Sequence, residues 1–242
     1  APFDPEIRDG RIYARGASDD KGQLFIHAKA AESILSATGS LPVNIKFIFE
    51  GEEEIGSVHL PAFVESHQEL LQADACIWEF GGVDHRDVPM QYLGLRGICY
   101  VELSVETAGM DVHFGLGCSI FPNAAWRLVW ALNTLKDQEE RIRLPGFYDP
   151  IIPPTEREFD LLAALPPVSQ EYKDRYGIAG FLKDFPDETA LRIAAVYEPT
   201  CTICGLTSGY QGPGSKTVLP ARASAKVDFR LVPGQTPALV LQ

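Results

Sequence analysis

The chain has 242 residues, 45% of them hydrophobic, and a formal net charge of −12 at neutral pH. This length is enough for a sizeable core, in one large domain or two smaller ones. The negative charge argues against nucleic acid and anionic membrane surfaces as partners, because both attract basic patches. No apolar run is long enough to span a bilayer, and no charged-then-apolar leader opens the sequence. Five cysteines, an odd number, favour a reducing compartment over a disulfide framework, so we expect a cytoplasmic protein.

The first elements alternate between strand and helix. A β-rich segment at 11–14 precedes an acidic run, GASDDKG at residues 16–22. Apolar residues then recur at helical spacing and predict a helix over about 20–37. Residues 43–49 alternate and predict a strand, which ends at a second acidic run, EGEEEIGS at 50–57. Together these elements predict a βαβ unit with both acidic runs beside strand ends, where open α/β sheets bind ligands.

Acidic side chains concentrated at one sheet edge point to a cation. Carboxylates without enough basic partners repel one another, and a divalent metal is the usual remedy. Glu53 and Glu54 would face opposite ways on a regular strand, so both can serve one site only if the chain turns at Gly56-Ser57. One carboxylate can then bind metal while its neighbour holds the water that the metal activates. The alternative is a solvated acidic loop beside a charged strand end.

The next segment supplies a further candidate ligand. A second helix is expected after residue 57, and residues 73–78 predict a buried strand that ends at Glu79. His85 and Asp87 are the runner-up ligands in this region. His59 and His67 lie on or near the expected helix in no ligand pattern, which favours surface or cap positions.

The character of the sequence changes around residues 93–97. Strands are predicted over 98–107 and near 200–206 and 221–232, with helices over 122–135 and 156–165. The predicted fold class is α/β, with one domain over residues 1–94 and a second over 95–242.

The two acidic runs, in this order around a βα unit, resemble the co-catalytic di-zinc amidohydrolase and peptidase family of carboxypeptidase G, aminoacylase, succinyl-diaminopimelate desuccinylase and carnosinase. The resemblance implies that Asp19 bridges two zinc ions, that Glu53 is the general base and that Glu54 ligates one zinc. It makes Glu79 the candidate ligand of the other zinc, with a plain strand-end glutamate as the alternative. It also implies a cis peptide bond between Asp19 and Asp20.

Three residues of the second domain resemble functional residues of the family. His113 resembles the lid histidine that crosses the dimer interface to stabilise the oxyanion, although Phe114 departs from the usual pattern. Thr217 in KTVLP resembles the carnosinase-branch threonine that contacts substrate. Arg230 in FRLVP resembles the arginine that grips the substrate carboxylate, a role that suits its planar fork. From the residues alone, the alternatives are a core histidine, a strand-edge threonine and an arginine in a surface ion pair.

The resemblance implies a partial zinc-peptidase-like catalytic domain over 1–94 and a β-α-β-β-α-β lid over 95–242. The lid would also form a homodimer and would be truncated at its C-terminal end, inside a second lid helix that begins at residue 237. The implied reaction is metal-dependent hydrolysis of dipeptides or short peptides. An N-acyl-amino-acid deacylase of the acetylornithine deacetylase or desuccinylase type is the alternative of the same fold. A non-catalytic fragment or dimerisation module is the alternative of another class. Two histidine ligands of the family are expected upstream of residue 1 and beyond Gln242, so this chain alone should bind zinc more weakly than its parent enzyme.

Overall fold

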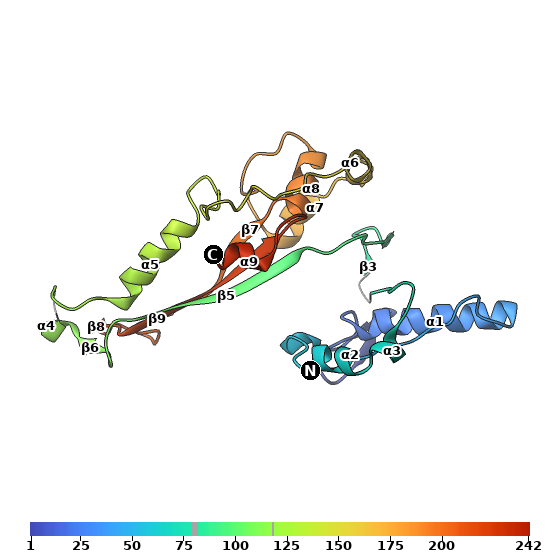
Figure 1. The fold of residues 1–242 in the computed structure, drawn as a ribbon, viewed down its shortest axis with the longest axis horizontal. Coiled ribbons are helices and arrows are strands. Elements are labelled where there is room, and N and C mark those ends of the chain that lie inside the picture. Colours follow the sequence, from blue (N-terminus) through green and yellow to red (C-terminus); the bar gives the residue numbers. More distant parts are fainter. Residues whose placement is uncertain (79–81, 118) are drawn as a thin grey trace. The chain divides into compact units, whose positions relative to one another are not determined.

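The computed structural model describes residues 1–78, 82–117 and 119–242. The chain divides into two compact units, residues 1–93 (unit 1) and residues 94–242 (unit 2). This division lies one residue before the boundary expected from the sequence. Figure 1 shows the elements of each unit. Together they make a mixed α/β fold with small sheets.

Unit 1 is built from short hairpins and helices. Its elements are β1 (Glu6–Arg8), β2 (Arg11–Tyr13), α1 (Lys21–Thr38), the 3₁₀ helix η1 (Glu53–Ile55), α2 (Leu60–Ser66), α3 (Gln68–Leu71), β3 (Gly82–Val83) and β4 (Pro89–Met90). The helix predicted over 20–37 is confirmed as α1, and the helix expected after residue 57 is present as α2 and α3. Helix α1 ends where Gly39 takes a φ of 80° and its amide donates to the carbonyl of Leu35 at 2.8 Å. Glycine suits this position because it adopts the left-handed conformation without a Cβ clash.

Of the three strands expected in unit 1, the β-rich segment 11–14 is confirmed as β2, but the strands predicted over 43–49 and 73–78 are wrong. Residues 43–49 and 73–78 belong to no strand, and β2 pairs antiparallel with β1, so the predicted βαβ unit is not formed within the described residues. The apolar side chains of segments 43–49 and 73–78 stay exposed: Phe49 is 60% and Ile77 is 83% exposed. An alternating pattern assigns side chains to two faces, but a strand also needs a neighbour to bond its backbone. Within the described residues neither segment has such a neighbour.

Unit 2 contains a three-stranded antiparallel sheet in the order β5-β9-β7. Its strands are β5 (Gly97–Glu106), β9 (Arg222–Leu231) and β7 (Thr200–Ser208), while β6 (Val112–His113) pairs with β8 (Val218–Leu219). Its helices are α4 (Phe114–Gly117), α5 (Ala124–Leu135), α6 (Glu156–Ala163), α7 (Ser169–Tyr176), α8 (Glu188–Tyr197) and α9 (Pro237–Val240). The strands and helices predicted after residue 97 are therefore confirmed to within a few residues. None of the helices in the described part of the chain is both long and apolar enough to cross a membrane.

The buried core lies in unit 2, on one face of this sheet. The central strand β9 alternates, and every second residue is buried: Ala223, Ala225, Val227, Phe229 and Leu231. This face packs against Ala124 and Leu128 of α5 and against Phe147. The other face of β9 carries the intervening residues, which include Asp228 and Arg230, because successive side chains on a strand point to opposite faces. The alternation thus places the candidate arginine on the sheet face away from α5.

Candidate metal and substrate site

The first acidic run forms a tight loop before α1. The peptide bond between Asp19 and Asp20 is cis, as the resemblance implied. The amide of Lys21 donates to the carbonyl of Gly16 at 2.9 Å, and Gly16 takes a φ of 80°. This turn sets Asp19 immediately before the N-terminal end of α1. No ion pair holds the Asp19 carboxylate among the described residues.

The second acidic run turns where the sequence predicted it. Glu53 and Glu54 lie in η1, and Gly56 follows with a φ of 89° and donates its amide to the carbonyl of Glu53 at 2.9 Å. The hydroxyl of Ser57 donates to the carboxylate of Glu50 at 2.6 Å. The two glutamates are therefore neighbours in a helical turn rather than on opposite faces of a strand.

His59 lies beside this turn, at the surface position that the sequence favoured. Its Nδ1 is 2.8 Å from a carboxylate oxygen of Glu52, and its side chain is 83% exposed.

Asp19 and Glu54 line the same cavity in unit 1, which has a volume of about 460 Å³. The rest of the lining comes from the N-terminal hairpin and the first acidic loop: Ala1, Pro2, Asp4, Glu6, Tyr13, Ala14, Arg15, Gly16 and Ser18. The lining thus includes four acidic residues and one arginine, and Glu6 also pairs with Arg8 at 3.7 Å. This excess of acidic residues favours a bound cation. Within the described residues, however, no three histidine, cysteine, aspartate or glutamate side chains gather closely enough to hold a metal ion. The structure thus brings two predicted ligands to one cavity without assembling a full ligand set.

The predicted ligand Glu79 lies outside the described residues. The runner-up ligands His85 and Asp87 are exposed in the turn between β3 and β4. Sequence reasoning overlooked Asp84. Its carboxylate accepts hydrogen bonds from the backbone amides of Val88 and Arg86 and from the Arg86 guanidinium. The Val88 amide is the main cause that lowers the pKa of Asp84 to about 2, with help from Arg86. Asp84 therefore stabilises the turn, and both of its carboxylate oxygens already accept hydrogen bonds there.

His113 and Thr217 lie in contact in unit 2, although far apart in the sequence. The pairing of β6 with β8 brings Thr217 Oγ1 to 3.2 Å from Nε2 of His113. The amide of Gly115 donates to Nδ1 of the same ring at 3.1 Å. Because Nδ1 accepts this bond, the proton of the neutral ring belongs on Nε2, facing Thr217. The structure thus joins two of the three residues predicted in this domain.

Arg230, the third, forms an ion pair on the sheet face away from α5. Its Nε and Nη2 atoms each lie 3.1 Å from Oδ2 of Asp228, and its side chain is 48% exposed. Sequence reasoning overlooked Asp228. The usable signal was its place two residues before Arg230 on a predicted strand, which puts both side chains on one face. The ion pair that was the alternative for Arg230 is present.

Comparisons with known proteins identify relatives of the whole chain. Residues 1–239 match the family model described as peptidase family M20/M25/M40. The rat protein named Beta-Ala-His dipeptidase is 33% identical over 96% of this chain and 47% of its own length. The Cys-Gly metallodipeptidase dug1 of Schizosaccharomyces pombe is 30% identical over 93% of this chain and 47% of its own length.

A solved structure shows the same fold. The M20 family metallo-carboxypeptidase Sso-CP2 from Sulfolobus solfataricus matches with a TM-score of 0.91 and 38% identity, over 100% of this chain and 54% of that one. The chain spans about half the length of the curated relatives it matches. Because the family model matches nearly every residue, the chain belongs to the peptidase family M20/M25/M40.

Proposed function

We propose that the protein hydrolyses the amide bond of dipeptides or short peptides in a metal-dependent reaction. The observation that carries this proposal is that Asp19 and Glu54, from two separate acidic loops, line one cavity. Family membership supports it, as do relatives named Beta-Ala-His dipeptidase and Cys-Gly metallodipeptidase. The solved structure named a metallo-carboxypeptidase also supports this proposal, since carboxypeptidases and dipeptidases both cleave beside a free carboxyl terminus.

Asp19 and Glu54 are residue types suited to zinc, for which aspartate and glutamate oxygens are ordinary ligands. In the proposed site Asp19, Glu54 and Glu79 would hold zinc. When bound, zinc lowers the pKa of a coordinated water toward neutrality.

Glu53 is the proposed general base. Glu53 lies in η1 next to Glu54, so the general base and a metal ligand can come from adjacent residues of one turn. Its carboxylate would take a proton from the attacking water and pass it to the nitrogen of the leaving amine.

Unit 2 would be the lid and dimerisation domain of a homodimer. The hydrogen-bonded pair of His113 and Thr217 would contact the substrate of another subunit, with the Nε2–H of His113 stabilising the oxyanion. Arg230 would bind the free carboxylate of the substrate, which favours short peptides over long chains. The cytoplasmic location stays a prediction.

The test uses the complete zinc-loaded protein and its Glu53→Gln variant. We expect hydrolysis of dipeptides in preference to N-acetyl or N-succinyl amino acids. We expect Glu53→Gln to lower turnover at least about 100-fold, because general base catalysis typically contributes that much, while zinc content stays unchanged. Glu52→Gln is the matched control, since its carboxylate contacts exposed His59, and it should keep normal turnover. Normal dipeptide hydrolysis by Glu53→Gln would show that the assigned base is wrong, and preference for N-acyl substrates would favour a deacylase.

A further inference from the structure

The guanidinium of Arg230 is held along one of its two hydrogen-bonding edges. An arginine can present a side edge, formed by Nε and one Nη, and an end edge, formed by both Nη atoms. In the structure the side edge of Arg230 faces Asp228, with Nε and Nη2 each 3.1 Å from Oδ2. The side chain of Arg230 makes no other polar contact within residues 1–78, 82–117 and 119–242. Its end edge is therefore available, and the half-exposed side chain leaves it accessible.

The carboxylate that holds Arg230 is itself rigidly placed. Asp228 is only 9% exposed, and it lies on the central strand β9 between Tyr100 of β5 and Thr202 of β7. Oδ1 of Asp228 is buried without a hydrogen-bond partner among the described atoms. A buried carboxylate is costly unless it is paired, so the contact with Arg230 differs from an exposed ion pair that forms and breaks freely. Asp228 thus offers a fixed anchor.

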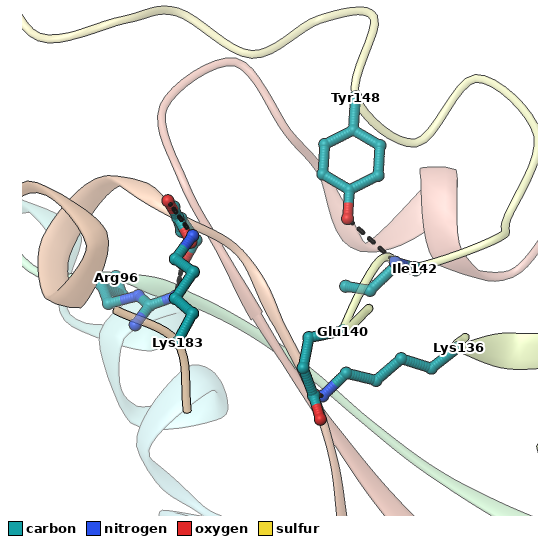
Figure 2. A network of polar contacts seen from close by, with 7 residues as sticks. Arg96, Lys136, Glu140, Ile142, Tyr148 and Lys183 are labelled. Atoms are coloured by element: carbon teal, nitrogen blue, oxygen red, sulfur yellow. Dashed lines mark hydrogen bonds and ion pairs between the residues drawn. The ribbon is translucent and has the colours of Figure 1, made fainter. Parts of the chain in front are cut away.

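A second arginine, Arg96, lies close enough to Arg230 and Asp228 to interact with both charges. Figure 2 shows Arg96 with its guanidinium turned toward the end of α8, where it donates to the backbone carbonyls of Ala195 and Glu198. Burial lowers the pKa of Arg96, the positive charge of Arg230 lowers it further, and Asp228 opposes both. Arg96 is thus committed to the helix terminus, where a cation is favourable. Asp228 offsets the repulsion between the two guanidinium groups.

We infer that Asp228 is a positioning residue that orients Arg230 so that its end edge is presented to the carboxylate of a peptide substrate. The end edge offers two parallel N–H groups, which match a carboxylate in a bidentate pair. The identity of the bound carboxylate rests on the proposed function, whereas the orientation of Arg230 rests on the contacts of unit 2 alone.

The kinetic test compares the complete protein with its Asp228→Asn variant, which keeps the shape of the side chain and removes its charge. We expect the KM for a dipeptide to rise about ten-fold while kcat changes less than about two-fold, because ground-state binding is lost. For the C-terminal amide of the same dipeptide the two proteins should have equal KM values, since the group that Arg230 binds is absent. Glu102→Gln, which removes an exposed carboxylate from the same face of β5, should leave both substrates unaffected. An unchanged KM for the free dipeptide, or an equal rise for the amide, would overturn the inference.

A second measurement decides the orientation of Arg230 without relying on activity. ¹⁵N relaxation of the arginine Nε–H groups in the wild-type protein should show Arg230 more ordered than exposed Arg157 of α6, and Asp228→Asn should abolish that difference. Equal mobility of Arg230 and Arg157 in the wild-type protein would overturn the inference even if the variant does not fold. Absence of dipeptide hydrolysis by the wild-type protein would instead contradict the proposed function.

Discussion

The two units differ in how their apolar residues are used. In unit 2 the alternation of β9 buries a continuous row of side chains against α5, and Val227 and Phe229 are almost completely inaccessible. In unit 1 no described residue is buried to that degree, and the alternating segment 43–49 leaves its apolar side chains exposed. Similar patterns therefore have different outcomes. The difference shows that a strand forms where a neighbouring strand completes its hydrogen bonds, and that alternation alone is not sufficient.

The largest expected effect contrasts one phenylalanine from each unit. In the 242-residue chain, Phe229→Ala should lower the free energy of unfolding by about 3–5 kcal/mol, because it leaves a cavity beside Phe147 in a closed core. Phe49→Ala should change it by less than about 1 kcal/mol, because that ring is already 60% exposed. Urea unfolding followed by circular dichroism measures both. Equal losses for the two variants would mean that segment 43–49 is packed as tightly as β9, which would remove the contrast.

The same contrast explains how much of the fold could be predicted from the sequence. Periodicity located α1 and α5 and the three strands of the unit 2 sheet. A helix closes its backbone hydrogen bonds within its own segment, and each of the three strands has a partner strand within the chain. The strands at 43–49 and 73–78 were predicted by the same reasoning and are wrong, because pairing is a property of two segments and the pattern of one segment does not report it.

The candidate site was predictable where a local turn decides it. Gly56 and Ser57 indicated the turn that makes Glu53 and Glu54 neighbours, and the acidic loops indicated the cavity that Asp19 and Glu54 share. Contacts set by strand pairing were less accessible. The hydrogen bond between His113 and Thr217 depends on the pairing of β6 with β8. The role of Asp228 depends on the burial of its side chain. Neither can be read from residue types alone.

The smallest expected effect is at Asp84, whose carboxylate accepts hydrogen bonds within a local turn of unit 1. Its pKa should be about 2, below the ordinary value of 3.8, chiefly because the Val88 amide donates to the carboxylate. A lowered pKa means that the ionised form stabilises the turn, fully above about pH 3.8 and less as the pH falls through about 2. NMR titration of the carboxyl carbon measures this. Arg86→Ala should raise the pKa only part of the way, and a pKa near 3.8 in the wild-type protein would contradict the turn geometry.

We propose that Asp19 belongs to a metal site in the acidic cavity of unit 1. The most direct measurement is the zinc content of the complete protein and of two matched variants, Asp19→Asn and Asp9→Asn, by elemental mass spectrometry. Asp9 lies in the turn between β1 and β2 and does not line the cavity, so its variant should bind as much zinc as the wild-type protein. We predict about two zinc ions per chain in the wild-type protein and a large loss in Asp19→Asn. Zinc content in Asp19→Asn equal to that of Asp9→Asn would contradict the account.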